Sequence, residues 1–426
     1  MKFWSENEKL SRKEIIDLQN KLLKETIRRA AKSILYREKL RNIDISNVNV
    51  EKITKLPFTT KDELRKHYPY GALAVPLRNV RRIHSSSGTL GKPVLTFYTT
   101  NDLEVWYDLL ARNLWAIGVR PGDIFQNTVG HGLFTGMGYM FGAEKIGCIV
   151  VPYGPAGPEK QLKAMMELEV TVFHATPSFA LKLADLAEEW NLVPGRDLKL
   201  KLAVVGAEFW TEHSRKRIED ALGIEAYNNY GLAEVGGPGV AIETPEHKGL
   251  MHVWADNFLI EVIDPETGES LGEGEEGELV ITTLRREAMP LIRYRTGDIV
   301  KLKGFDCGER PGHPLISWFK GRLDDMVKVR GVGLYPENVE EVIMKFKELK
   351  PNYVIILTEY DNIKVLVEAK KGLAKNLKEY LEERIAKELK KKTLLKVNVK
   401  VVDSNEIEKY VSVRGKTKRI VDLRTI

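Results

Sequence analysis

The chain has 426 residues and a mass of 48.4 kDa, which is more than one hydrophobic core normally serves, so we expect at least two domains. Hydrophobic residues make up 43% of the chain and charged residues 30%, and no apolar stretch approaches the length of a membrane span, so the composition is that of a globular, soluble protein. The net charge of +6 comes from 66 basic and 60 acidic residues that are interleaved along the chain, which argues against a nucleic-acid-binding protein.

The first residues, MKFWSENEKLSRKE, contain no apolar core of a secretory signal, so we expect a cytoplasmic protein. Cys148 and Cys307 are the two cysteines of the sequence. Two thiols are too few for a disulfide framework or for a zinc site built from thiolates.

The N-terminal residues predict helical scaffold. Apolar side chains fall on one broad face of a helical repeat between residues 6 and 40. In LPFTTKDELRKHYP, Glu63 follows Thr60 by three positions, which is the pattern of a capping box at a helix start. We interpret this stretch as the structural entry to a helix.

The segment from Arg81 to Tyr98, RRIHSSSGTLGKPVLTFY, predicts two strands joined by a tight polar loop. Glycines let backbone N–H groups approach a ligand closely, hydroxyls donate hydrogen bonds and a lysine adds charge, so this loop suits a polyphosphate. The candidate residues of this phosphate loop are Ser85, Ser86, Ser87, Gly88, Thr89, Gly91 and Lys92.

Two other interpretations of the loop compete with phosphate binding. A Walker loop fails on spacing, because two residues separate Gly88 from Gly91 where that motif has four, and because Pro93 and a strand follow Lys92. A surface hairpin loop without a ligand stays open on this stretch alone.

Asn101 to Ile117 predicts an amphipathic helix that is opened by Asn101. Five glycines between Gly130 and Gly142 are interleaved with aromatic residues, which fits either close packing against a neighbour or the wall of a cavity. For His131, a hydrogen bond within a loop is favoured over the role of a catalytic base.

Continuous apolar runs rich in β-formers begin near Cys148, Thr171 and Lys201 and are separated by helical segments. This order predicts a buried parallel sheet that is covered by helices. Ligands of such sheets lie outside the carboxyl ends of the strands. The candidates at those ends are Gly206, Ala207, Glu208, Tyr230 and Gly231.

Two further motifs, NNYGLAEVGGPG from Asn228 and PLIRYRTGD, contain residues suited to a nucleotide. The ring of Tyr230 can stack on adenine, and Glu234 four residues later offers a carboxylate for the magnesium that accompanies ATP. Asp298, which follows Gly297, suits two ribose hydroxyls. Between these motifs, IEVIDPETGESLGEGEEGELVITT predicts a β-hairpin.

The character of the chain changes near residue 321. GRLDDMVKVRGVGLYPENVEEVI predicts a polar connector and then a helix with Pro336 at its start, and the following strand, turn, strand, long helix and strand predict a compact α+β module. The helix from Ala374 to Lys392 mixes lysines with glutamates, so a solvated face is favoured over nucleic-acid binding. Lys416 lies on a glycine-containing loop near the end.

Six motifs, SSSGTLGKP, GAEFW, YGLAE, YRTGD, GRLDDMVKVRG and RGKTKR, resemble in sequence and order those of the acyl-adenylate-forming superfamily. HGLFTG, IDPETGE, IRYRTGD and RGVGLYPENVEEV resemble the phenylacetate–CoA ligase branch, and the similarity covers nearly the whole chain. The resemblance implies an α/β fold. Residues 1–322 would form a large adenylation domain with mixed and parallel sheets covered by helices, and residues 323–426 a small mobile α+β domain.

The resemblance implies an enzyme that joins an aryl acid such as phenylacetate to coenzyme A. The carboxylate attacks the α-phosphate of ATP to give acyl-AMP and pyrophosphate, and the CoA thiolate then displaces AMP, with Mg²⁺ as the accompanying metal. The partners are then small molecules rather than a nucleic acid or a membrane, and a homodimer is left open. An alternative within the same chemistry transfers AMP to the hydroxyl of a deazaflavin coenzyme without CoA.

Family roles can be carried over to residues of this sequence. The phosphate loop would hold the leaving β- and γ-phosphates. Ala207, Glu208 and Tyr230 would shape the adenine site, and Asp298 and Arg322 would fix the ribose.

The remaining implied roles concern metal, charge and motion. Glu234 would orient Mg²⁺, and Lys416 would donate to the α-phosphate and carboxylate oxygens as negative charge accumulates there. Asp324 is the hinge position of the family. The wall of the acyl pocket, which would favour a flat aryl acid, would consist of His131, Gly132, Phe134 and Gly136.

Two departures from the family pattern stand out. Leu90 replaces a threonine that the family usually has in its phosphate loop, so one hydroxyl is missing. Some relatives carry a cysteine-rich knuckle, whereas Cys307 and His313 are what this sequence has there, so we predict no structural zinc.

Overall fold

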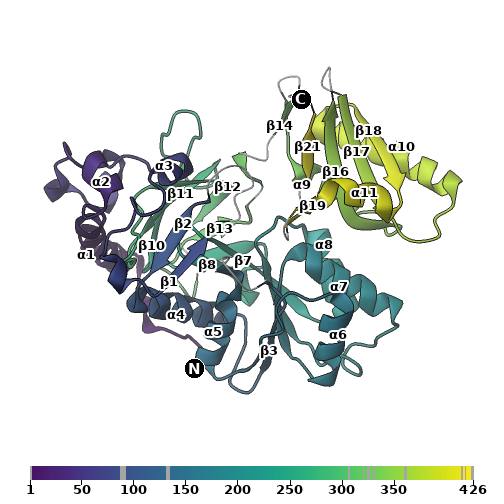
Figure 1. Ribbon diagram of the computed structural model, residues 1–426, viewed down its shortest axis with the longest axis horizontal. Helices are drawn as coiled ribbons and strands as arrows, with labels where there is room; N and C mark the ends of the chain where they lie inside the picture. Colours follow the sequence, from purple (N-terminus) through teal and green to yellow (C-terminus); the bar gives the residue numbers. More distant parts are fainter. Residues whose placement is uncertain are drawn as a thin grey trace. The chain divides into compact units, whose positions relative to one another are not determined.

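The computed structural model describes residues 2–86, 93–130, 135–305, 308–319, 321–323, 327–329, 332–358, 362–413, 416–417 and 419–423. The chain forms two compact units (Figure 1). The first consists of Met1–Ala207 and Ala221–Phe319, and the second of Glu208–Asp220 and Lys320–Ile426. The sequence placed a domain boundary after residue 322, and that boundary stays a prediction.

The first unit is organised around a large mixed sheet, which among the described residues has the strand order β10-β11-β12-β13-β9-β8-β7-β6-β5-β3-β4. Its neighbours β4–β3, β3–β5, β5–β6 and β6–β7 all pair in parallel, which confirms the predicted parallel sheet. The parallel strands are β3 (Ile124–Asn127), β4 (Ile149–Val151), β5 (Val172–Ala175), β6 (Leu202–Gly206) and β7 (Glu225–Leu232).

Helices connect these parallel strands, as crossovers between parallel neighbours require. Figure 1 shows the connecting helices of the first unit beside the strands, and their bounds are α5 (Gly138–Ile146), α6 (Pro158–Glu167) and α7 (Pro177–Glu189). The helix between β6 and β7, α8 (Glu212–Leu222), belongs mostly to the second unit. The inner strands β3, β5, β6 and β7 are buried along most of their length, whereas the edge strand β4 is partly exposed. Their carboxyl ends therefore form the natural edge for a ligand.

The rest of the sheet is antiparallel and begins at β7, which pairs antiparallel with β8. The predicted hairpin from IEVIDPETGE onward is confirmed, because β10 and β11 pair antiparallel from Phe258↔Thr283 to Ile263↔Glu278. The strands of this part are β8 (Gly237–Glu243), β9 (Leu250–Val253), β10 (Phe258–Ile263), β11 (Glu276–Thr283), β12 (Tyr294–Gly304) and β13 (Leu315–Ser317).

The predicted strand, loop and strand around the phosphate loop are also present. β1 (Arg82–Ser85) pairs antiparallel with β2 (Leu95–Tyr98), from Arg82↔Tyr98 to Ser85↔Leu95. The loop itself, residues 87–92, lies outside the described residues.

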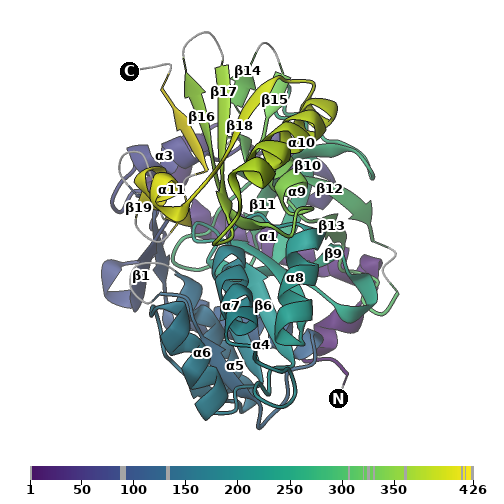
Figure 2. The ribbon, with the colours of Figure 1, turned by 90° about the vertical axis from the view of Figure 1, so that its right-hand side faces the viewer.

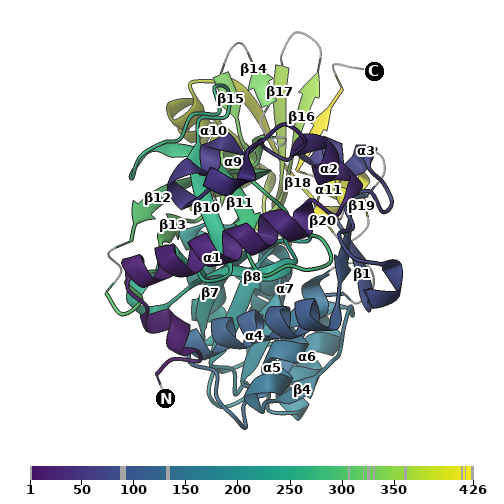
Figure 3. The ribbon, with the colours of Figure 1, turned by 90° about the vertical axis from the view of Figure 1, so that its left-hand side faces the viewer.

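The N-terminal segment forms α1 (Arg12–Ala30), α2 (Ile34–Lys39) and α3 (Lys61–Lys66), together with short 3₁₀ turns. Figure 3 shows α1 running across the antiparallel strands, and Gln19 Nε2 donates to Ala255 O at 2.8 Å while Thr26 Oγ1 donates to Leu284 O at 3.0 Å. The predicted capping box at Thr60 and Glu63 is confirmed.

The N-cap of the helix predicted from Asn101 lies two residues earlier than predicted. α4 spans Thr100–Ala116, and its N-cap is Thr99 rather than Asn101. The Thr99 hydroxyl accepts from Asp102 N, and the Asp102 carboxylate accepts in return from Thr99 N, so the reciprocal pair decides where the helix starts.

Glycines of the stretch from residue 130 to 142 let α5 pack closely on α4. A Cβ at Gly138 would lie 2.3 Å from Trp106 Cζ2, and a Cβ at Gly142 would lie 2.7 Å from Leu110 Cβ and 2.8 Å from Ala111 N. Of the two interpretations of these glycines, close helix packing therefore holds for Gly138 and Gly142.

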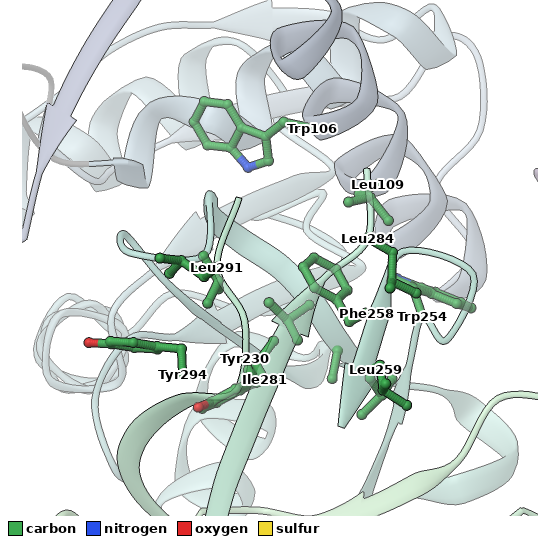
Figure 4. Close-up of a cluster of buried hydrophobic side chains, with 14 of the residues drawn as sticks. Trp106, Leu109, Tyr230, Trp254, Phe258, Leu259, Ile281, Leu284, Leu291 and Tyr294 are labelled. Carbon is green, nitrogen blue, oxygen red and sulfur yellow. The ribbon is translucent and has the colours of Figure 1, made fainter. Parts of the chain in front are cut away.

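Large apolar side chains from α4 and from both parts of the sheet fill the core of the first unit, part of which is shown in Figure 4. Trp254 is fully buried and its Nε1 donates to Asn113 Oδ1 at 2.7 Å. Arg112, which lies over the Trp254 ring, binds Asp256 through two hydrogen bonds of 2.8 and 3.1 Å. The buried charge at this point is thus paired rather than isolated.

The second unit is an α+β module, as predicted. Its sheet has the order β18-β17-β16-β21, with β16 and β17 antiparallel and the outer pairs parallel (Figure 2). Pro336 occupies the first turn of the helix after the connector, which confirms that prediction. The elements are β14 (Val327–Val329), β15 (Val332–Leu334), α9 (Pro336–Ile343), β16 (Leu349–Thr358), β17 (Asn362–Ala369), α10 (Lys375–Thr393), β18 (Val397–Val402), α11 (Ser404–Val411), β19 (Ser412–Val413), β20 (Lys416–Thr417) and β21 (Ile420–Asp422).

The long helix α10 has one buried face and one solvated face. Its buried side chains are Leu381, Ile385, Leu389 and Thr393. Between them the lysines and glutamates face solvent, and Lys391 pairs with Glu388 at 3.0 Å. The solvated charged face predicted for this helix is therefore confirmed.

We expect Gly142→Ala to lower the free energy of unfolding by about 1–3 kcal/mol, because the added methyl group must push into Leu110 and the Ala111 backbone. Alanine has a higher helix propensity than glycine, by about 1 kcal/mol. If α4 and α5 were loosely packed here, Gly142→Ala would therefore stabilise the protein. Urea denaturation measures the change. Glu144→Ala on the exposed side of α5 is the matched control, with an expected change within about 0.5 kcal/mol.

Candidate active site

Several predicted residues meet at the carboxyl ends of β6 and β7. These strands are parallel neighbours with Gly206 opposite Asn229, so the end of β6 lies beside Tyr230 and Gly231. A Cβ at Gly206 would lie 2.4 Å from Asn229 Nδ2 and 2.6 Å from Asn229 O. Glycine at this position is therefore required by the close approach of the two strand ends.

Ala207, directly after β6, has a backbone φ of +71°. A residue with a side chain adopts this left-handed conformation at a cost of about 1 kcal/mol or more. Strained backbone of this kind is concentrated at ligand sites, where it aims a peptide group. The conformation of Ala207 thus agrees with its candidate role at the strand end.

Tyr230 and Asp298 are brought together although they come from strands well separated in the sheet order. The Tyr230 hydroxyl donates to Asp298 Oδ2 at 2.7 Å, and both residues are buried. Four strand steps separate β7 from β12 along the sheet, so the sheet must curl for this contact to form. The hydrogen bond fixes the orientation of the tyrosine ring against the aspartate.

The position of Asp298 is further set by its own strand. Gly297 has a φ of +76°, its N–H donates to Glu278 Oε1 at 3.0 Å, and Asp298 N donates to Thr296 Oγ1 at 3.1 Å. Glu278 in turn accepts from Arg295 Nε at 2.8 Å. The glycine of the YRTGD motif therefore serves a bend whose hydrogen bonds turn the aspartate toward Tyr230.

Glu234, the candidate metal ligand, lies just after β7 and is buried, with an ion pair to a residue that the sequence did not single out. Lys61 Nζ lies 3.2 Å from Glu234 Oε1. Lys61 is the first residue of α3, directly after the Thr60 cap. The sequence offers one signal for Lys61. A cation at a helix N-terminus opposes the helix dipole, so a lysine at this position suggests an acidic partner elsewhere in the chain.

The described part of the phosphate loop begins as a regular hairpin. Ser85 ends β1, and Ser86 N donates to Val94 O at 2.9 Å. Val94 N donates to Ser86 Oγ at 3.2 Å, so the serine oxygen is an acceptor within the hairpin. The candidates outside the described residues are Ser87, Gly88, Thr89, Gly91 and Lys92.

A narrow cavity lies behind the Glu234 loop, between Val235–Pro238 and α4. Trp106 Nε1 donates to Pro238 O at 2.8 Å, and a Cβ at Gly237 would lie 2.8 Å from the Trp106 ring. A Cβ at Gly136 would lie 2.3 Å from Val129 Cγ1. Gly237 thus packs tightly against Trp106, and the predicted pocket residue Gly136 packs tightly against Val129. The other predicted pocket residues, His131, Gly132 and Phe134, lie outside the described residues.

Comparison with known proteins places most of the chain in two family models. Residues 29–284 match the family model described as AMP-binding enzyme, and residues 331–424 match the AMP-binding enzyme C-terminal domain. A phenylacetate-coenzyme A ligase of Thermus thermophilus is 37% identical over the whole of both chains, and one of Aromatoleum evansii is 40% identical over 98% of this chain and 96% of its own.

The chain belongs to the phenylacetate–CoA ligase family of AMP-binding enzymes. A solved 2-hydroxyisobutyryl-CoA ligase, in complex with its acyl-AMP, has the same fold, with a TM-score of 0.88 at 23% identity over 100% of this chain and 93% of that chain. The resemblance and the fold class predicted from the motifs are therefore confirmed.

The other candidate residues lie in the second unit or outside the described residues. Glu208 and Arg322 group with the second unit. The backbone of Lys416 lies in β20, opposite Val413 of β19, and Asp324 lies outside the described residues. Their functional roles stay predictions.

Two buried histidines of the first unit, His174 and His313, hydrogen-bond within the core. Burial lowers the pKa of His174 to about 3, so the ring is neutral at neutral pH, and its Nδ1 lies 3.0 Å from Asn127 Oδ1. His313 Nδ1 accepts from Ala255 N at 3.0 Å and its Nε2 donates to Asn7 O at 3.0 Å, so both ring nitrogens are used. The absence of a structural zinc nevertheless stays a prediction, because Cys307 lies outside the described residues.

No helix in the described parts of the chain is long and apolar enough to span a membrane. Within those same parts, no group of three or more histidine, cysteine, aspartate or glutamate side chains could hold a metal by itself.

We expect Tyr230→Phe to lower the free energy of unfolding by about 1.5–3 kcal/mol, because it removes a hydrogen bond to the buried Asp298 carboxylate. Denaturation followed by tryptophan fluorescence measures the change. Tyr153→Phe, at an exposed tyrosine, is the control and should leave stability unchanged. Equal stability of Tyr230→Phe and the wild type would show that the hydroxyl does not hold the two strands together.

Proposed function

We propose that the chain is an ATP-dependent ligase that joins phenylacetate, or a similar aryl acid, to coenzyme A through an acyl-adenylate. The observation that carries the proposal is the contact between Tyr230 and Asp298 at the strand edge, with Glu234 close by in the sequence. A nucleotide needs an aromatic face, an acceptor for ribose and a carboxylate for its metal, and these three residues supply them.

The nucleoside and the phosphates of ATP would be bound by different residues. The Tyr230 ring, fixed by its hydroxyl, would face the adenine, and Asp298 would accept from the ribose together with the tyrosine. Ser86 would donate its hydroxyl hydrogen to a phosphate oxygen, since its own oxygen is already hydrogen-bonded to Val94 N. The remainder of the phosphate loop would add donors and the charge of Lys92.

Glu234 fits the metal role, because it is a buried carboxylate whose partner is a lysine rather than a second acid. Mg²⁺ bound between this carboxylate and the phosphates would offset the negative charge of ATP. Magnesium as the metal and a cytoplasmic location are predictions from the sequence, which leaves a homodimer open.

Residues of the second unit would complete the reaction. Lys416 would stabilise charge on the α-phosphate and the attacking carboxylate, and Arg322 would contact the ribose. Movement at Asp324 would then let the CoA thiol replace Lys416 near the acyl-adenylate. Glu208 would border the adenine site together with Ala207.

Phenylacetate as the acid is supported by the names of the relatives and by the glycine and aromatic residues of HGLFTG. The transfer of AMP to a deazaflavin hydroxyl is not supported, because these relatives are coenzyme A ligases.

The function is tested by ATP–pyrophosphate exchange followed by product analysis. We expect exchange that requires phenylacetate and metal, and phenylacetyl-CoA with AMP once CoA is added. Acetate should support much less exchange than phenylacetate. Exchange without any acid, or stable AMP transfer to an acceptor with no thioester formed, would contradict the proposed function.

We expect Lys416→Ala to lower the rate of pyrophosphate exchange by about 100-fold or more while the dissociation constant of ATP changes by less than about threefold, because the lysine acts mainly on charge in the transition state. Exchange kinetics and calorimetry measure the two effects. Lys409→Ala, at an exposed lysine of α11, is the control. Near-normal exchange in Lys416→Ala would remove Lys416 from the mechanism.

A further inference from the structure

The ion pair between Lys61 and Glu234 connects the N-terminal segment with the site. Lys61 Nζ lies 3.2 Å from Glu234 Oε1, and the exposed fractions of the two side chains are 23% and 7%. The carboxylate is therefore almost fully withdrawn from water, while the ammonium group keeps some access to it. An exposed ion pair contributes little, but removing one partner of a buried pair leaves an uncompensated charge.

Lys61 is held in place by a rigid local structure. The Thr60 hydroxyl accepts from Glu63 N, and the Glu63 carboxylate accepts from Thr60 N at 2.8 Å and from Lys39 Nζ at 2.6 Å. The start of α3 is thus fastened both within its own turn and to α2.

The residue before this turn attaches it to the strand of Asp298. Thr59 N donates to Arg293 O at 2.9 Å, and Arg295 N donates to Thr59 O at 2.9 Å. The buried Thr59 hydroxyl also donates to Ile292 O at 2.8 Å. Through Thr59, the start of α3 is therefore attached to the strand that contains Asp298. This attachment holds Lys61 where its ammonium group reaches Glu234.

The electrostatic consequence concerns ATP without its metal. Two anions that approach closely in a partly desolvated site repel each other strongly. The carboxylate of Glu234 would repel the phosphates of ATP for this reason. A cation paired with Glu234 removes this repulsion before a metal is present. A lysine at the first position of a helix is disfavoured by the helix dipole, so helix stability does not explain this side chain.

We propose that Lys61 is a positioning residue that neutralises and orients Glu234 in the metal-free enzyme and releases this carboxylate to Mg²⁺ when the metal arrives with ATP. The inference rests on the proposed function, since it takes Glu234 as the metal ligand. It adds to that function a residue of the N-terminal segment that acts through Glu234.

The test measures ATP binding by calorimetry without any acid, once in EDTA and once in saturating Mg²⁺. In Lys61→Met we expect the dissociation constant of ATP to rise about tenfold or more in EDTA, and less than about threefold in Mg²⁺, because the metal then supplies the missing charge. Lys61→Arg should restore the wild-type ratio of the two constants. Lys66→Met, an exposed lysine on the same helix, should match the wild type in both buffers.

Each outcome decides the proposal. If Lys61→Met loses affinity equally in both buffers, the proposal is overturned, because Lys61 would then contact the nucleotide itself or only support the fold. No loss of affinity in either buffer would also overturn it. In Glu234→Gln the added Lys61→Met change should have little effect, and a full effect there would also overturn it. A wild-type protein that does not bind ATP in Mg²⁺ would instead refute the proposed function, which separates the two failures.

Discussion

The hydrogen bond from Tyr230 to Asp298 is the constraint on which the site depends. Its two partners lie 68 positions apart in sequence and on strands that do not neighbour each other in the sheet, so it exists only if the sheet curls between β7 and β12. The antiparallel strands that follow β7 make this possible, because they bring Asp298 of β12 to Tyr230 of β7. The aromatic ring and the carboxylate then meet with both groups buried.

The same curled region is fixed from outside by the N-terminal segment. Arg293 has a φ of +46°, and its guanidinium group binds Glu261 at 2.8 and 3.0 Å and lies over the Phe58 ring. Thr59 N donates to Arg293 O, and Thr59 O accepts from Arg295 N. The segment that precedes the first strand therefore supports the candidate site. It is hydrogen-bonded to the strand of Asp298, and it places Lys61 beside Glu234.

Local patterns in the sequence predicted the elements that local interactions decide. The parallel strands, the hairpin of β10 and β11 and the capping box at Thr60 follow from apolar runs, turn residues and cap spacing. The start of α4 was predicted wrongly, because Thr99 and Asn101 are both good caps and only the reciprocal bond with Asp102 chooses between them. The pairs Tyr230–Asp298 and Lys61–Glu234 join distant parts of the chain, and no local pattern contains them.

The central claim is that adenine, ribose and metal sites are built from Tyr230, Asp298 and Glu234 at one edge of the sheet. The most direct test is a crystal structure with a non-hydrolysable sulfamoyl analogue of phenylacetyl-AMP. The account predicts the adenine against the Tyr230 ring and the ribose hydroxyls on Asp298, with the tyrosine hydroxyl still bonded to that carboxylate. An analogue bound elsewhere, or a ribose that leaves Asp298 without contact, would contradict it.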